Sequence, residues 1–152
     1  MDRRRLEAAL PGNARLVIGD IASTVGPFLA ALPTTSPIGY VDLDVDYYSS
    51  AVDALRLFTG EPEQYLPTTL LYLDDIAFDG HNPWCGELAA VAEFNAANEL
   101  RKVNPFPALR QKRIFKNASW IDHVYVVNVL DHPTRNRASA AARQVLANPY
   151  LP

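Results

Sequence analysis

Four aspartates stand where two apolar runs of this chain end, and their spacing is the first indication of chemistry. Asp44 and Asp46 follow one run, and Asp74 and Asp75 follow the next along the chain. If both runs are strands of one open α/β sheet, these side chains lie at the edge where such sheets bind their ligands. Carboxylates so close together repel one another unless a cation, a proton or a basic partner neutralises them.

A hard divalent cation is the simplest counter-charge for these aspartates. The closest arginine is Arg56, which lies inside the following helix, and oxygen ligands select magnesium, calcium or manganese. The alternative is that each aspartate caps a helix or closes a turn through its own side chain. Four carboxylates at two strand ends favour a site over four separate caps. Asp42 is left out, because strand alternation leaves its face undecided.

Strands that alternate with helices are expected to position these residues. Strands are predicted at residues 14–18, 38–43 and 68–73, and helices at 23–32, 50–59, 84–100 and 137–147. Two further β-rich segments, 110–116 and 121–130, are separated only by residues 117–120, which predicts an antiparallel hairpin because a parallel crossover needs a longer link. The pattern predicts an α/β layered sheet with an antiparallel edge.

Composition limits the class of protein. With 152 residues, 49% hydrophobic and 20% charged, the chain is expected to be one soluble globular domain, residues 1–152. A formal charge of -3 gives no electrostatic case for nucleic acid or anionic lipid, and no stretch approaches a membrane span. Cys85 is the only cysteine, so no internal disulfide can form and a cytoplasmic setting is expected.

The acidic motifs resemble those of a known enzyme family. Residues 43–50, Leu-Asp-Val-Asp-Tyr-Tyr-Ser-Ser, and residues 71–76, Leu-Tyr-Leu-Asp-Asp-Ile, are similar to the strand ends of macrocin-type O-methyltransferases. These are class I S-adenosylmethionine-dependent enzymes that methylate sugar hydroxyls on natural products. The resemblance implies a Rossmann-like methyltransferase sheet, S-adenosylmethionine as methyl donor and a small-molecule hydroxyl as acceptor.

The resemblance also implies roles for individual residues. It implies that Asp44, Asp74 and Asp75 hold a magnesium ion and that Asp46 is the general base for the acceptor hydroxyl. A metal lowers the pKa of a bound hydroxyl, and a carboxylate within reach then accepts its proton. Asp20, in a Gly-Asp turn, corresponds to a position near the adenine of the donor, although helix capping explains it equally well.

Three more side chains are candidates for the acceptor pocket: Tyr47, His81 and Trp84. Tyr47 follows the first acidic motif, and His81 and Trp84 belong to the loop after the second. The plainer interpretation is that Tyr47 is structural, that His81 is an ordinary loop histidine and that Trp84 packs under the loop.

The family pattern is incomplete in this chain. Class I methyltransferases begin with a glycine-rich turn that receives the donor, and no such turn is found among the seven glycines here. The chain therefore corresponds to the carboxy-terminal part of the domain, without its first strands. The strands at 14–18 and 38–43 would then lack their shared neighbour and leave apolar faces exposed. This suggests a truncated reading frame, a fragment, or a chain that completes itself with a partner, such as a homodimer.

Two other functions remain open at this point. An apolar strand that ends in Asp-x-Asp, as at Asp44 and Asp46, is also how metal-dependent glycosyltransferases hold a sugar nucleotide, but this leaves Asp74 and Asp75 unexplained. A non-catalytic remnant or interaction module is favoured by the missing donor half.

Overall fold

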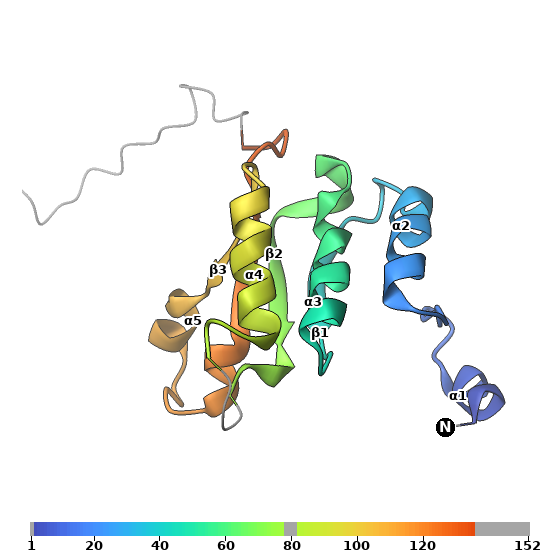
Figure 1. Ribbon diagram of the computed structural model, residues 1–152, viewed down its shortest axis with the longest axis horizontal. Coiled ribbons are helices and arrows are strands. Elements are labelled where there is room, and N and C mark those ends of the chain that lie inside the picture. The colour runs from blue at the N-terminus through green and yellow to red at the C-terminus, as the bar shows by residue number, and fades with distance from the viewer. Residues whose placement is uncertain (1, 78–81, 136–152) are drawn as a thin grey trace, which may run out of the picture.

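A four-stranded mixed sheet forms the centre of the described chain, which is residues 2–77 and 82–135 of the computed structural model. The strands are β1 (Ile38–Leu43), β2 (Tyr65–Leu73), β3 (Arg101–Pro105) and β4 (Val124–Val129), in the spatial order β1-β2-β4-β3 (Figure 1). β1 and β2 are parallel, and β4 lies antiparallel to both β2 and β3. The predicted mixed α/β class with an antiparallel edge is confirmed.

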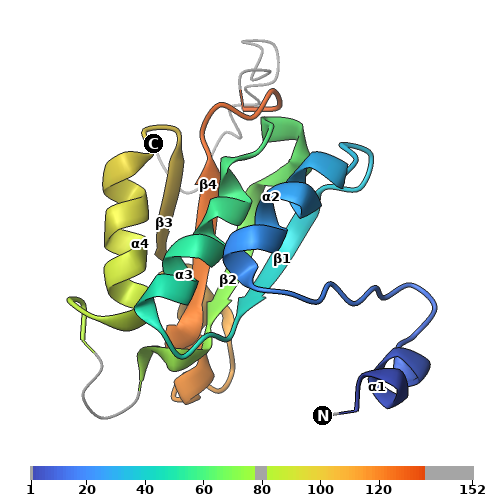
Figure 2. The ribbon, with the colours of Figure 1, turned by 45° about the vertical axis from the view of Figure 1, so that its right-hand side comes forward.

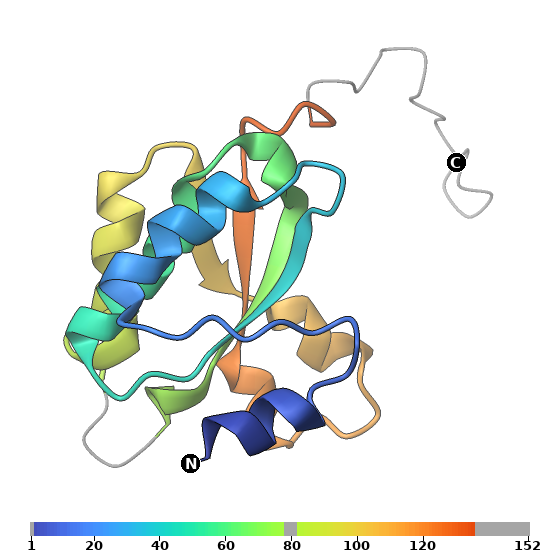
Figure 3. The same ribbon diagram turned by 90° about the vertical axis from the view of Figure 1, so that its right-hand side faces the viewer.

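Three helices cover one face of this sheet. They are α2 (Ile21–Ala31), α3 (Tyr48–Leu55) and α4 (Gly86–Ala97), and Figures 1 and 2 show them side by side. The short α5 (Pro107–Lys112) lies on the opposite face (Figure 3). Helix α1 (Arg3–Ala9) stands away from the sheet and buries none of its residues (Figure 2). No helix of the described residues is both long and apolar enough to span a membrane.

Single 3-10 turns complete the connections. They are η1 (Arg56–Thr59), η2 (Pro62–Gln64), η3 (Asp74–Ile76) and η4 (Ser119–His123). Turn η3 directly follows β2, and turn η4 directly precedes β4. Because β2 and β4 are antiparallel neighbours, both turns lie at the same edge of the sheet.

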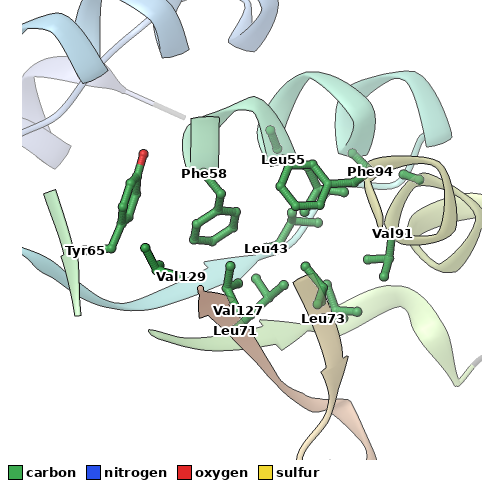
Figure 4. Close-up of a cluster of buried hydrophobic side chains, with 14 residues drawn as sticks. Leu43, Leu55, Phe58, Tyr65, Leu71, Leu73, Val91, Phe94, Val127 and Val129 are labelled. Atoms are coloured by element: carbon green, nitrogen blue, oxygen red, sulfur yellow. The ribbon is translucent and has the colours of Figure 1, made fainter. Parts of the chain in front are cut away.

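The hydrophobic core lies between the sheet and helices α3 and α4 (Figure 4). Leu71 and Val127 are fully buried on the sheet, and the rings of Phe58 and Phe94 meet edge to face with their centroids 6.4 Å apart. Burying a side chain of this size stabilises a fold by about 1.5–3 kcal/mol. The core therefore fixes the positions of β1 and β2, the two strands that carry the aspartates.

The opposite face of the sheet remains partly uncovered. Three of its large apolar side chains are exposed to a considerable extent: Tyr40 (56%), Leu66 (44%) and Leu70 (38%). Helix α5 and turn η4 border this face, with Phe106 and Trp120 beside a cavity of about 360 Å³. Apolar patches of this kind on a soluble chain mark contact surfaces more often than isolated exposed residues do.

The predicted buried strand at residues 14–18 is wrong. This segment pairs with none of the described strands, and Val17 and Ile18 are about half exposed (49% and 52%). Strand β1 pairs with β2 alone within the described residues, so a cavity of about 450 Å³ lies between β1, α2 and Val17. A strand needs a neighbour that supplies its hydrogen bonds, and here that neighbour is absent from the described chain.

The predicted hairpin is wrong in its first strand. Residues 110–112 belong to α5, and Ile114 and Phe115 are highly exposed (91% and 82%). The strand that precedes β4 in the chain and pairs with its outer side is β3, in which Val103 lies opposite Val127. The second predicted strand, 121–130, is confirmed as β4, although η4 occupies its first residues.

The remaining element predictions differ mainly in their bounds. Strand β1 has the predicted limits, and β2 begins at Tyr65 instead of Thr68. The predicted helix at residues 84–100 is α4, whose bounds are narrower. The predicted helix at residues 137–147 lies outside the described residues.

Candidate functional site

The register of β1 and β2 brings the two acidic motifs to the same edge. Leu43, the last residue of β1, lies opposite Leu73, the last residue of β2. Asp44 and Asp74 are the next residues along two parallel strands, and neighbouring strands lie about 4.8 Å apart. The predicted meeting of the two motifs at the carboxyl ends of adjacent strands is therefore supported at the level of the backbone.

The four aspartates differ in their surroundings. Asp44 and Asp46 are exposed, whereas Asp74 and Asp75 are half-buried in turn η3. Among the described residues, no three histidine, cysteine, aspartate or glutamate side chains come close enough to hold a metal ion as they stand. The predicted ligand set of Asp44, Asp74 and Asp75 thus shares one sheet edge without forming a three-residue cage.

A fifth carboxylate at this edge, Glu87, was not predicted from the sequence. Glu87 lies in the first turn of α4 and is only 2% exposed. Its Oε2 accepts a hydrogen bond from the backbone N–H of Asp75 at 3.2 Å, and the backbone N–H of Val45 also faces the carboxylate. Val45 directly follows Asp44, so Glu87 lies between the turns that end β1 and β2.

Burial and negative neighbours perturb this carboxyl group. Burial raises the pKa of Glu87 from its ordinary value of 4.5 to about 7, and the charges of Asp75 and Asp74 act in the same direction. The N–H groups of Asp75 and Val45 oppose the rise in pKa because they stabilise the charged form. Glu87 therefore holds a proton at a pH where an exposed glutamate has lost it.

The spacing of α4 explains why Glu87 was missed. In the sequence alone, Leu88, Val91, Ala92 and Asn95 also have the spacing of one helix face, and that set does not include Glu87. The buried residues are Glu87, Ala90, Val91 and Phe94, which have the i, i+3, i+4, i+7 spacing of a core-facing stripe. A charged residue at the first position of an otherwise apolar stripe is the sequence signal that identifies it.

A buried histidine also contacts the end of β2. The Nδ1 atom of His123 lies 2.7 Å from the carbonyl oxygen of Leu73, and its ring stacks on Tyr72 with the centroids 5.4 Å apart. Because a carbonyl oxygen only accepts, Nδ1 carries the proton and donates. His123 thereby ties η4 to the last residue of β2, a role that its sequence context did not reveal.

The residues predicted for donor and acceptor binding lie farther apart. One carboxylate oxygen of Asp20 accepts the N–H of Ala22 at 2.9 Å and caps α2, which is the alternative that the sequence left open. Tyr47 is the N-cap residue of α3 and 72% exposed, and Trp84 is 88% exposed, so neither packs as a structural residue would. His81 lies outside the described residues.

The cavity beside β1 opens next to the first acidic motif. It measures about 450 Å³ and is lined mainly by apolar side chains of α2 and β1, together with Asp42 and Asp44. This size falls within the range of small-molecule sites. Gly19, whose φ of 149° favours glycine, also lines the cavity, and a Cβ atom there would lie 2.7 Å from Thr24 Cγ2.

Comparison with known proteins identifies no relative: no family model, curated protein or solved structure matches this chain.

Proposed function

We propose that this chain is the acceptor-side part of a class I, S-adenosylmethionine-dependent O-methyltransferase, acting on a hydroxyl of a sugar or another small natural product. The observation that carries this proposal is the register of Leu43 with Leu73, which brings Asp44 and Asp74 to the same edge of adjacent parallel strands. Asp44, Asp46, Asp74 and Asp75 also occupy the positions of the family's acidic motifs. A cytoplasmic location belongs to the same proposal.

The kind of ligand atom available at this edge of the sheet suits magnesium. All candidate ligands are carboxylate oxygens, and magnesium typically takes one or two carboxylates and keeps several waters. Asp44 and Asp74 would supply such a pair, with Asp75 beside them in η3. A bound cation there would polarise the acceptor hydroxyl.

Asp46 would take the proton in this reaction. Its exposed carboxylate follows β1 at the open side of the edge, where an acceptor hydroxyl can approach it. Bound S-adenosylmethionine would supply the methyl group with its sulfur as the leaving group, and Asp46 would accept the proton that the acceptor hydroxyl gives up. Positioning of the two reactants supplies most of the remaining rate acceleration.

The donor site requires residues beyond those that the described chain brings together. The cavity beside β1 has the size for part of a ligand, but no glycine-rich turn borders it. In this proposal the missing strand and donor loop come from another polypeptide segment that pairs with the outer edge of β1.

Cation binding tests the acidic edge directly. We expect the chain to bind Mn²⁺, which can be measured as a loss of the paramagnetic resonance signal of the free ion. The double variant Asp44→Asn, Asp74→Asn should weaken this binding at least tenfold. Glu63→Gln is the matched control, because it removes one charge from an exposed residue at the opposite edge of the sheet. Equal binding by the control and the double variant would reject the site.

Calorimetry separates the two enzyme classes. For the methyltransferase we expect heat of binding with S-adenosylmethionine, and none with a sugar nucleotide, once the segment that supplies the donor loop is paired with this chain. The reverse result would favour the glycosyltransferase that Asp44 and Asp46 also suggest.

An interaction module is the second candidate function, and the uncovered sheet face favours it. Tyr40, Leu66 and Leu70 are exposed on that face, and β1 offers an unpaired edge within the described residues. A chain that binds no cation and no donor, but forms a stable dimer, would support this second function.

A further inference from the structure

Glu87 occupies a position that an apolar residue would normally fill. It begins the buried stripe of α4, followed by Ala90, Val91 and Phe94. Gly86 precedes it with a φ of +55°, a left-handed conformation that favours glycine and sets the direction in which α4 begins. The backbone at the start of α4 thus turns a carboxyl group into the interior.

The contacts of Glu87 reach both acidic strand ends. Its Oε2 accepts the N–H of Asp75 in η3, and the Val45 N–H, directly after Asp44, faces the same carboxylate. Helix α4 packs against both α3 and η3. Glu87 is therefore a side chain of α4 that contacts the turns at the ends of both β1 and β2.

This arrangement does not maximise stability. Glu87 Oε1 is buried and makes no hydrogen bond to any described residue. A buried polar atom without a partner destabilises a fold, and an apolar residue of similar volume is often tolerated as well or better. Packing alone therefore gives no reason for a carboxyl group at this position, whereas the contact with Asp75 does.

We propose that Glu87 is a positioning residue that fastens turn η3 to the start of α4 and so holds Asp74 beside Asp44. The effect on a cation site rests on the proposed function, but the contact between Glu87 and Asp75 can be tested without it. Hydrogen bonds to the groups around a metal site typically change metal affinity by 10- to 100-fold when they are lost.

Amide hydrogen exchange at Asp75 tests the contact without any ligand. Glu87→Met removes the acceptor but keeps the side-chain length, and Glu87→Gln keeps an acceptor oxygen. We expect the Asp75 amide to exchange roughly 10- to 100-fold faster in E87M than in the wild-type chain, and at close to the wild-type rate in E87Q. Unchanged exchange in E87M would overturn the proposal.

The affinity for Mn²⁺ then tests whether losing this contact weakens cation binding by the aspartates at the ends of β1 and β2. We expect E87M to weaken Mn²⁺ binding roughly 10- to 100-fold and E87Q to weaken it about threefold or less. Equal loss in both variants would overturn the proposal, because it would show that the charge of Glu87 acts on the cation directly. Glu99→Gln, an exposed position just after the same helix, is the control and should bind normally.

The two experiments also separate the two levels of inference. If the wild-type chain binds no Mn²⁺, the metal-dependent function fails, while the exchange of Asp75 still decides whether Glu87 fastens η3. If E87M does not fold, the E87Q chain decides instead. In E87Q the glutamine still offers an amide oxygen as acceptor, so fast exchange of the Asp75 amide in this variant would contradict the proposed hydrogen bond.

Discussion

Carboxyl groups gather at the ends of β1 and β2, and their environments divide them into two kinds. Asp44 and Asp46 are exposed and available to a ligand. Glu87 is enclosed, and its burial costs free energy that a surface carboxylate does not incur. An exposed acid can act on a substrate, whereas an enclosed one can fix the backbone around it.

The enclosed carboxyl group makes stability depend on pH. Folding raises the pKa of Glu87 from 4.5 to about 7, so the folded chain keeps this proton to a higher pH than the unfolded chain. The stabilisation from this proton is complete below the unfolded pKa and is lost as the pH rises through the folded pKa. The charged groups that face Glu87 are Asp74 and Asp75, and Tyr125 lies near enough for Glu87 to raise its pKa.

Glu87→Gln should remove this pH dependence. We expect the free energy of unfolding of E87Q, relative to wild type, to increase from about pH 5 to about pH 8, by at most roughly 3 kcal/mol. Urea unfolding at a series of pH values measures this difference. Glu99→Gln, which removes an exposed carboxylate just after the same helix, should show little change. A constant difference between E87Q and wild type would argue against the raised pKa.

The Asn95 side chain of helix α4 positions β3 by forming two hydrogen bonds to its backbone, as a neighbouring strand would. The Asn95 side chain donates from Nδ2 to the carbonyl oxygen of Val103 and accepts the Val103 N–H at Oδ1, both at 2.7 Å. Val103 is also paired with Val127 across β4. These bonds satisfy backbone groups at the outer edge of β3, which explains how a short strand of mixed composition joins the sheet.

Asn95→Ala should therefore loosen β3. Losing both bonds leaves the N–H and C=O of Val103 without these partners, and we expect a loss of about 1–3 kcal/mol in the free energy of unfolding. Thermal unfolding followed by circular dichroism gives the comparison, and wild-type stability in N95A would show that these bonds contribute nothing.

The molecule as a whole covers one face of its sheet much better than the other. Helices α2, α3 and α4 pack on the core face, whereas Tyr40, Leu66 and Leu70 of the other face are exposed. Strand β1 also ends the sheet with an edge that no described strand covers. Both features favour association with another polypeptide.

Lysines on the uncovered face should reduce that association. We expect the wild-type chain to gain mass with concentration in size-exclusion chromatography with light scattering, and Leu66→Lys together with Leu70→Lys to shift it towards the monomer. Because both leucines are exposed, the stability of the variant should change by about 0.5 kcal/mol or less per residue. A wild-type chain that stays monomeric at every concentration would contradict this prediction.

Local patterns in the sequence were sufficient for part of the fold and part of the candidate site. The apolar runs that end at Asp44 and Asp74 predicted β1 and β2, and thereby the sheet edge where the aspartates lie. The apolar run within 121–130 predicted β4. In each case the residues themselves carry the strand signal, because a strand buried on the core face needs apolar side chains wherever it is placed.

Tertiary contacts alone decided the rest. Residues 110–116 are β-rich but pair with no strand among residues 2–77 and 82–135, whereas Arg101–Pro105 becomes β3 because Asn95 and β4 bind its backbone. Residues 14–18 have a strand composition, yet they pair with none of the strands that the structure describes. Glu87 resembles a surface residue in sequence, and only the packing of α4 against η3 encloses it. Strand pairing and the burial of a charge depend on residues distant in the chain, which local periodicity does not encode.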